Sequence, residues 1–157
     1  MTVSRKPAQK PAAEGVSSAA DYRALAELRH QIRRFLKFSE AEARAAGIEP
    51  QQHQLLLAVK GLPDDMRPTI RTIADRLQVQ HHTVVGLVDR LVTAKLARRR
   101  TSELDRREIL VEITPRGESL LQKLVLLHSA ELRTVGPALA AALDSILKTK
   151  DVEEPDS

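Results

Sequence analysis

Residues 69–117 carry His81, His82 and a cluster of arginines, side chains that bind anions and hydrogen-bond to base edges. Within this segment apolar residues recur at helical spacing over 70–77 and again over 84–92, which predicts a short helix and a second, amphipathic helix. Thr69 is a suitable N-cap for the first. A short helix, a tight turn and a second helix with an open polar face form the helix-turn-helix arrangement, whose second helix lies in the major groove of DNA. The open face of the second helix carries His81, His82, Thr83, Gly86 and Arg90.

The segment after the second helix predicts a basic β-hairpin. Residues 96–101 and 108–113 have the character of two strands, and the connector between them is charged. In the second strand Ile109, Val111 and Ile113 fall on one side, which we expect to be the buried side. A helix-turn-helix followed by a hairpin is typical of a winged helix, whose wing can reach phosphates or the minor groove.

Length and charge fit a single nucleic-acid-binding domain. The chain has 157 residues, a formal net charge of +4 and a pI of about 9.7. Within residues 95–107, six basic residues against two acidic ones leave a net charge of +4, so the excess lies in the wing. Aromatic residues make up only 2% of the chain, so we expect an aliphatic core of packed helices.

Residues required for several other functions are missing. There is no cysteine, which excludes disulfides, thiolate metal sites and thiol redox sensing. The five histidines show no His-x-x-x-His spacing and no nearby carboxylate cluster, so we expect no metal. Without a glycine-rich phosphate loop or a paired-carboxylate motif, we expect neither an enzyme nor a cofactor. No apolar run approaches the ~20 residues of a membrane span and no signal peptide is evident, so we expect a cytoplasmic protein without membrane contact.

Four segments carry a resemblance to a known family: IADRL at 73–77, TVVGLVDRL at 83–91, DRR at 105–107 and ITPRG at 113–117. They resemble the DNA-binding region of the MarR (multiple antibiotic resistance regulator) family, whose wing has an Asp-x-Arg motif and whose closing strand runs into a Thr-Pro-x-Gly helix start. The resemblance extends from about Ala20 to Lys148 and implies a mainly α fold with a small β-hairpin wing, that is, a winged helix-turn-helix domain plus N- and C-terminal dimerisation helices.

In the wing, the resemblance matches Arg107 to the arginine of the family motif, with Asp105 orienting it or bracing the hairpin. An arginine at a wing tip can enter a narrow minor groove, and the alternative is a solvated charged loop. The arginines of 98–100 are expected to serve phosphates or to pair with Glu108 and Glu112. The predicted DNA-binding residues are His81, His82, Thr83, Gly86, Arg90, Arg99, Arg106 and Arg107.

The start of the second helix leaves two interpretations open. His81, His82 and Thr83 either contact base edges or cap and shield the helix start. Gln80 stands where Ser, Thr, Asp or Asn usually caps a helix, so we expect weak capping. Gly86 either gives up a base contact or lets the backbone approach DNA closely.

We expect one folded domain over residues 19–148, between a disordered N-terminal arm at 1–18 and an acidic C-terminal tail at 149–157. Its winged helix-turn-helix part is expected at 50–114. The segments 20–46 and 115–148 are expected to be dimerisation helices, because they carry more apolar surface than one copy can cover.

Start and stop signals divide these segments further. The first helix is expected to begin near Asp21, to carry an apolar stripe from Leu25 to Ser39 and to stop at Gly47. Thr114 and Pro115 predict the start of a later helix. Gly136 and Pro137 are expected to interrupt it, so that a separate last helix follows over 138–148.

The resemblance also implies a pocket for a small amphipathic ligand, often a phenolic or aromatic acid, between the dimer helices and the winged helix. By residue type Arg34, Phe38 and His53 would supply a charge, a ring and a hydrogen-bond partner, and for His53 the alternative is a structural histidine. We therefore expect a homodimeric repressor that binds a pseudo-palindromic operator in double-stranded DNA and is released by such an effector. The alternative is a winged-helix protein-interaction module without a specific DNA target.

Overall fold

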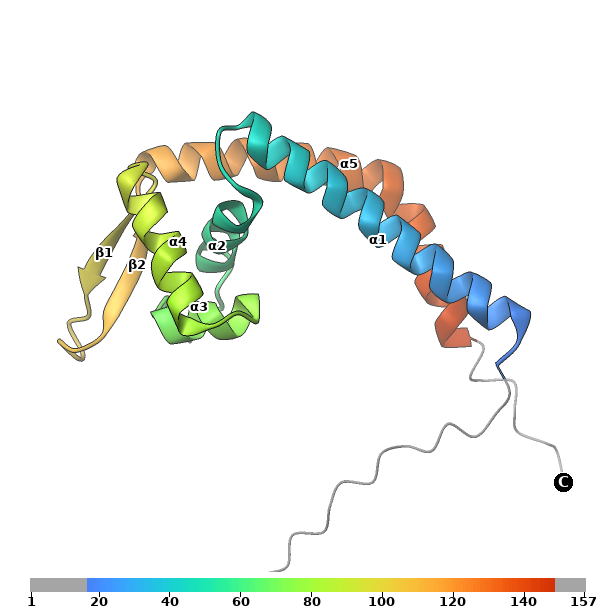
Figure 1. Cartoon of the computed structure of the whole chain (residues 1–157), viewed down its shortest axis with the longest axis horizontal. Helices are drawn as coiled ribbons and strands as arrows, with labels where there is room; N and C mark the ends of the chain where they lie inside the picture. The colour runs from blue at the N-terminus through green and yellow to red at the C-terminus, as the bar shows by residue number, and fades with distance from the viewer. Residues whose placement is uncertain (1–16, 149–157) are drawn as a thin grey trace, which may run out of the picture.

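The computed structural model describes residues 17–148, which form five helices and one antiparallel pair of strands. The helices α1 and α5 lie along each other and extend away from the winged helix, which sits at one end of the molecule (Figure 1). The predicted acidic tail and most of the predicted N-terminal arm lie outside the described residues. The elements are α1 (Ala19–Ala45), α2 (Pro50–Lys60), α3 (Ile70–Leu77), α4 (His81–Thr93), β1 (Ala97–Thr101), β2 (Ile109–Ile113) and α5 (Pro115–Lys148).

Both ends of α1 are explained by local hydrogen bonds. Ser18, not Asp21, is the N-cap: the Asp21 N–H donates to Ser18 Oγ over 3.2 Å, and the Ser18 N–H donates to Asp21 Oδ2 over 2.7 Å. This reciprocal capping box corrects the predicted start. At the other end Gly47 has a φ of +87°, and the N–H of Ile48 donates to the carbonyl of Ala43 over 3.1 Å. The predicted stop at Gly47 is confirmed.

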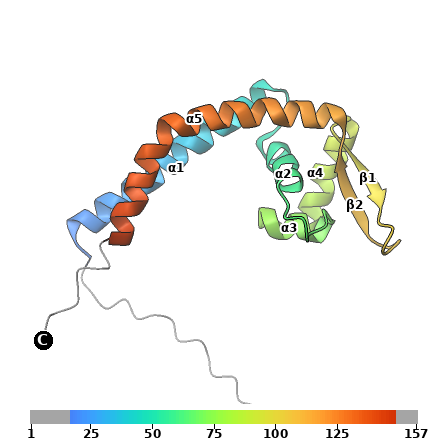
Figure 2. The same ribbon diagram turned by 180° about the vertical axis from the view of Figure 1, so that it is seen from behind.

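The predicted break at Gly136 and Pro137 is wrong, because α5 continues through both residues to Lys148. Proline has no N–H and leaves one backbone carbonyl of the preceding turn without its helical partner, which normally kinks a helix. Here Val135 and Ala142 are buried on either side of Pro137, and α5 packs along α1 over this part of its length. Packing on both sides of the proline holds the helix together, and Figure 2 shows α5 changing direction in its C-terminal half rather than ending.

An aliphatic core joins the winged helix to the start of α5. Its buried members come from every helix and both strands, and the largest of them include Leu55, Leu56, Ile73, Val84, Val88, Leu91, Val111 and Leu124. The simple alternation predicted for β2 is wrong, since Leu110 and Val111 are both buried and Ile109 is exposed. The chain just before α3 runs along β2, with a bridge between Thr69 and Leu110, so the strand is covered on more than one side.

A close contact fixes α5 to the start of the wing. Thr114 Oγ donates to the carbonyl of Lys95 over 2.7 Å, and its N–H donates to the carbonyl of Leu96 over 3.1 Å. The same hydroxyl accepts the N–H of Gly117 over 3.1 Å, which caps the helix. A Cβ at Gly117 would lie 2.1 Å from the Leu96 carbonyl oxygen, so only glycine fits there. The Thr-Pro-x-Gly sequence is therefore a cap and a backbone contact combined.

A small aromatic cluster joins α1, α2 and α5. The His53 ring of α2 lies 4.9 Å from the His128 ring of α5, and Phe35 and Phe38 of α1 meet His128 edge-on at 5.8 and 5.7 Å. His128 Nδ1 lies 2.5 Å from the carbonyl of Leu124 and its Nε2 lies 2.7 Å from Ser39 Oγ. Because a carbonyl only accepts, Nδ1 of His128 donates to the carbonyl of Leu124.

The apolar stripe of α1 is only half covered in this chain. Leu28 and Phe35 are partly buried and Ser39 is buried, whereas Leu25, Ile32 and Leu36 stay exposed. Over residues 17–148 no helix is both long and apolar enough to cross a membrane.

His53 should make folding stability depend on pH. Burial, and secondly the neighbouring His128, lower the pKa of His53 from its ordinary value of 6.5. The unfolded chain therefore takes up the proton first, so the stabilisation is complete above about pH 6.5 and is lost as the pH falls below it. We expect the melting temperature of His53→Leu to fall less between pH 7 and pH 5 than that of the parent protein.

The matched control is His30→Gln, since His30 is exposed on α1. It should keep the full pH dependence of the melting temperature. Equal losses in His53→Leu and the parent would show that His53 does not control this dependence.

Candidate nucleic-acid interface

Helix α4 is held by one apolar face and leaves the other open. Val84, Leu87, Val88 and Leu91 are buried against the core. Gln80 is the N-cap but makes no side-chain cap bond, so the predicted weak capping is confirmed. Of the residues predicted to contact DNA, His81, His82 and Arg90 are exposed, and Thr83 and Gly86 are partly buried. A side chain at Gly86 would meet open space, so nothing within the chain requires glycine there.

The turn between α3 and α4 sets the angle of the second helix. Thr69 caps α3 by accepting the N–H of Thr72 over 3.1 Å, as predicted. Gln78 adopts the left-handed conformation with a φ of 53°, and the N–H of Val79 donates to the carbonyl of Ala74 over 3.1 Å. The turn therefore ends α3 sharply, and α4 begins two residues later with its first turn open to solvent.

Asp105 braces the tip of the wing through the backbone. Its Oδ1 accepts the backbone N–H of Arg107 over 2.9 Å, so Asp105 bonds the main chain of Arg107 and not its guanidinium group. Ser102 is buried beneath the tip, where its Oγ accepts the N–H of Leu104 over 3.3 Å. The guanidinium groups of Arg106 and Arg107 are left exposed on a hairpin that is held by its own backbone.

The arginines of β1 pair with carboxylates inside the chain. Arg98 lies 2.9 Å from Glu112, its cross-strand partner, and Arg100 lies 4.0 Å from the same carboxylate, diagonally across the hairpin. The hydrogen bond from Arg98 lowers the pKa of Glu112. Arg99 instead forms an ion pair with Asp89 and so ties the wing to α4.

The predicted pairing of Glu108 with these arginines is wrong. Arg67, in the loop before α3, bonds Glu108 over 3.2 Å. Its guanidinium also donates to Ser102 Oγ over 3.3 Å. The wing is thus held to the helix-turn-helix on two sides, by Arg67 and by Arg99.

A groove of about 470 Å³ lies between the first turn of α4 and the wing. It brings together three predicted residues, His81, Arg99 and Arg107, and adds Arg71, which sequence reasoning missed. The sequence could have indicated Arg71, because it lies two residues after the cap residue Thr69, on the polar side of α3. Arg71 and Arg107 form no ion pair among the described residues, so both cations remain available.

The three residues proposed to bind a ligand are placed differently from one another. Phe38 packs against His128, and His53 lies in the same aromatic cluster with only 2% of its surface exposed. Arg34 is exposed and bonds Gln31 on its own helix over 3.4 Å. A ligand could reach His53 only if the rings separated. Within residues 17–148 no group of three or more His, Asp or Glu side chains could hold a metal ion.

Comparison with known proteins agrees with this geometry. Residues 46–108, from the α1–α2 turn to the wing, match the model of the MarR family. No curated relative matches the sequence.

Solved structures share the fold over most of the chain. AbsC, a MarR family transcriptional regulator from Streptomyces coelicolor, is 19% identical with a TM-score of 0.68, over 88% of this chain and 93% of that one. CouR from Rhodococcus jostii RHA1, bound to p-coumaroyl-CoA, is 18% identical with a TM-score of 0.65, over 90% of this chain and 100% of that one. A mutant of S. aureus MepR bound to an oligodeoxyribonucleotide is 20% identical with a TM-score of 0.61, over 82% and 96%.

The family match covers the segment that builds the groove, and the shared fold includes the two long helices. Residues 46–108 thus match the MarR family model, and most of the chain shares the winged helix-turn-helix fold of solved MarR family regulators.

Proposed function

We propose that this regulator is a homodimeric repressor that binds a pseudo-palindromic operator through α4 and the wing. The observation that carries the proposal is the groove in which the unpaired cations Arg71 and Arg107 flank the exposed start of α4 at His81. The two cations can bind the phosphates of DNA, and the N-terminal turn of α4 beside them can enter the major groove. MepR, which shares the fold, has been seen with an oligodeoxyribonucleotide, and this supports the same use here.

Each predicted contact has a role in this arrangement. The first turn of α4, with His81, His82 and Thr83, reads base edges, and the open space at Gly86 lets the backbone approach the groove. Arg106 and Arg107 reach the minor groove or its phosphates from the braced hairpin. Arg90 offers a further cation in the last turn of α4, and Arg99 contributes mainly by holding the wing against α4.

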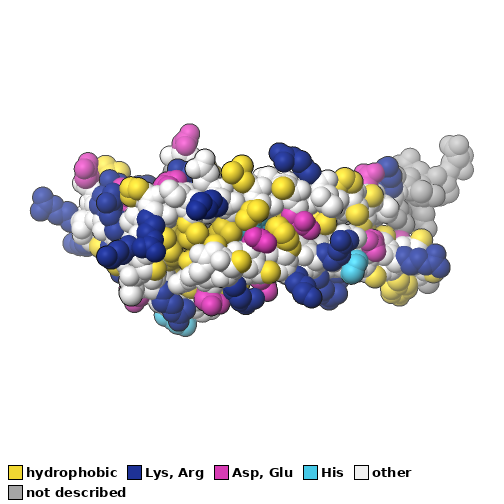
Figure 3. Space-filling view, turned by 90° about the horizontal axis from the view of Figure 1, so that it is seen from above, with side chains coloured by type: hydrophobic (Ala, Val, Ile, Leu, Met, Phe, Trp, Pro, Cys, Tyr) yellow, Lys and Arg dark blue, Asp and Glu magenta, His cyan; other side chains and the backbone are white. Residues whose placement is uncertain are grey.

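Dimerisation is proposed from the uncovered apolar faces of α1 and α5. Leu25, Ile32 and Leu36 follow one face of α1, and Leu132, Leu143 and Leu147 are exposed on α5. Viewed from above, hydrophobic side chains run along the middle of the molecule among charged ones (Figure 3). Two copies joined there would present their α4 helices to successive major grooves, ~34 Å apart.

An effector would release the DNA by favouring a different arrangement of the two winged helices, because only a ligand with unequal affinity for two states shifts their populations. CouR bound to p-coumaroyl-CoA shows that a protein with this fold takes a small ligand. Cytoplasmic location, the absence of a cofactor and the absence of enzymatic activity belong to the same proposal.

Arg107→Ala should weaken DNA binding. The substitution removes one charge-assisted contact, so we expect affinity to fall about tenfold, which corresponds to ~1.4 kcal/mol. The slope of log affinity against log salt should flatten by about one or less. The measurement is a titrated gel shift with the DNA flanking the regulator's own gene and excess competitor DNA, repeated at several salt concentrations.

Arg23→Ala is the matched control, because Arg23 is exposed in the first turns of α1, at the far end of the molecule from the wing (Figure 1). It removes the same charge and should leave both values unchanged. If Arg107→Ala left both the DNA affinity and its salt dependence unchanged, the wing would not take part in DNA binding. If the parent protein bound this DNA no better than competitor DNA, the result would favour the alternative, a winged-helix protein-interaction module without a specific DNA target.

Leu36→Glu should convert the dimer to a monomer, since it buries a charge in the proposed interface. Sedimentation equilibrium or light scattering over a range of protein concentrations measures the change. Leu104→Glu is the control: Leu104 is 83% exposed at the tip of the wing, outside both long helices. A parent protein that stays monomeric at all concentrations would contradict the proposed dimer.

A further inference from the structure

The tip of the wing carries the most exposed large apolar side chain of residues 17–148. Leu104 has 83% of its surface exposed, compared with 69% for Tyr22 and 66% for Leu126. It lies in the loop of residues 102–108 between β1 and β2, which Figure 1 shows at the outer end of the winged helix. Single exposed leucines are common on protein surfaces, so a role for Leu104 has to follow from how it is held and from what surrounds it.

Hydrogen bonds hold the loop on both sides of Leu104. The N–H of Leu104 donates to Ser102 Oγ over 3.3 Å, and the N–H of Ser102 donates to the carbonyl of Glu108 over 3.0 Å. The N–H of Glu108 donates to the carbonyl of Asp105 over 3.0 Å, and Asp105 Oδ1 accepts the N–H of Arg107 over 2.9 Å. The backbone at Leu104 is therefore fixed while its side chain stands in solvent.

The loop is also tied to the helix-turn-helix. Ser102 is only 3% exposed, and its Oγ accepts the guanidinium of Arg67 over 3.3 Å. The same guanidinium bonds Glu108 over 3.2 Å, so Arg67 connects the segment before α3 to both ends of the wing loop. A side chain that is positioned in advance loses little conformational freedom when a partner covers it. Leu104 is preorganised in this sense.

The loop around Leu104 is too polar for a wide apolar contact. Its other six side chains are one serine and five charged residues. A stable protein interface covers about 800 Å² of each partner and has an apolar centre of several residues. One leucine among charges does not provide such a centre. The tip therefore suits a narrow surface into which a single side chain enters.

The charges of the loop do not explain the leucine either. Residues 103–107 hold two acidic and two basic side chains, so their formal net charge is zero. Attraction to phosphates accounts for Arg106 and Arg107 but not for Leu104, which stands between two acidic residues. Leu104 contributes to binding only if its apolar surface is removed from water.

In the proposed DNA complex, the minor groove is the surface that meets the tip of the wing. This groove is about 6 Å wide, which admits a side chain but not a helix. Some DNA-binding proteins insert Leu, Ile, Phe, Met or Pro between neighbouring base pairs there, which partly unstacks the bases and kinks the duplex. An isolated apolar side chain on a fixed backbone is what this mode of binding requires.

We propose that Leu104 is an apolar wedge that enters the minor groove, partly unstacks one base step and bends the operator at that point. The inference rests on the proposed DNA-binding function and adds to it a residue that selects sequence through the deformability of DNA. Pyrimidine–purine steps (TA and CA/TG) unstack most easily, so the operator should have such a step under each wing. Arg106 and Arg107 would bind phosphates next to the opened step.

The first test measures the affinity of Leu104 variants of the full-length protein for the DNA flanking the regulator's own gene. Leu104→Ala should bind about tenfold more weakly, equivalent to ~1.4 kcal/mol. Its salt slope should equal that of the parent, because no phosphate contact is lost. Leu104→Met keeps a long apolar side chain and should bind within about threefold of the parent.

Leu57→Ala is the matched control, because Leu57 is a partly exposed leucine of α2, outside the wing and the DNA-binding groove. It should bind DNA as the parent does. Affinity of Leu104→Ala within about twofold of the parent would contradict the proposal. So would a weaker affinity accompanied by a flatter salt slope, because that result would assign the effect to a charge contact.

The second test measures the shape of the bound DNA. Circularly permuted fragments report the bend, which should lie between roughly 20° and 90° for the parent and be clearly smaller for Leu104→Ala. 2-Aminopurine placed at the pyrimidine–purine step that a hydroxyl-radical footprint locates under the wing should brighten on binding of the parent, because unstacking relieves its quenching. Leu104→Ala should leave the fluorescence low. Equal bends and equal fluorescence in the two proteins would rule out a wedge.

The third test changes the DNA instead of the protein. Replacing the pyrimidine–purine step under the wing by a GC step should weaken binding of the parent about tenfold and binding of Leu104→Ala by much less. Such a double-mutant cycle isolates the interaction between the side chain and the step. Equal losses in both proteins would show that another residue reads this position.

The outcomes separate the wedge from the function on which it rests. If the parent protein bound this DNA no better than competitor DNA, the proposed regulator function would fail. Specific binding by the parent together with an unaltered complex in Leu104→Ala would overturn the wedge alone. A change in the oligomeric state of free Leu104→Ala, measured by sedimentation equilibrium, would place Leu104 in a protein contact and also overturn it.

Discussion

The contact between the start of α5 and the start of β1 is the constraint on which the arrangement of this molecule depends. Thr114 bonds the carbonyls of Lys95 and Leu96, and Gly117 lets the two backbones approach to a distance that a side chain would prevent. Because this contact involves main-chain atoms, it fixes the direction of α5 relative to the wing more strictly than side-chain packing alone. The long helices therefore leave the winged helix at a defined angle, and α1 follows by packing along α5.

Local sequence signals predicted most of this fold correctly, since each is decided within a few residues. Thr69 caps α3 and Gly47 follows the end of α1, as the sequence indicates. The break at Pro137 failed because packing between distant segments decided it: Val135 and Ala142 are both buried, and they hold the helix on either side of the proline. A single-sequence pattern contains no information about that packing.

In the candidate site, too, local sequence signals predicted some features, whereas contacts between distant segments could not be predicted. Periodicity placed His81 and His82 on the open face of α4, but the partners of the arginines could not be predicted from spacing. The pairing of Arg99 with Asp89 joins two elements, and that of Arg67 with Glu108 joins residues 41 positions apart. The aromatic cluster around His128 was missed for the same reason, since its rings come from three helices.

The distribution of arginines explains how a basic wing serves both folding and binding. Arg98, Arg99 and Arg100 are neutralised by Glu112 and Asp89, which stiffens the hairpin and removes their charge from competition for DNA. Exposed ion pairs of this kind contribute little to stability individually, so their main effect is to fix orientation. The cations left unpaired, Arg71 and Arg107, line the groove beside the first turn of α4.

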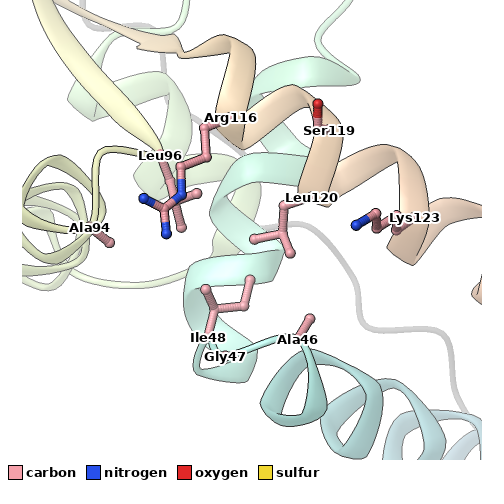
Figure 4. Close-up of a pocket in the computed structure, with 9 residues that line it drawn as sticks. All are labelled: Ala46, Gly47, Ile48, Ala94, Leu96, Arg116, Ser119, Leu120 and Lys123. Carbon is pink, nitrogen blue, oxygen red and sulfur yellow. The ribbon is translucent and has the colours of Figure 1, made fainter.

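Helix α4 is the element that connects the two surfaces of the winged helix. Its N-terminal turn borders the cationic groove, its C-terminal end lies beside the turn after α1 and the first turns of α5 (Figure 4), and its buried face is packed along the length between them. Val84, Leu87, Val88 and Leu91 hold this 13-residue helix against the core along its length. The same packing therefore fixes where its first turn, with His81, lies beside the wing.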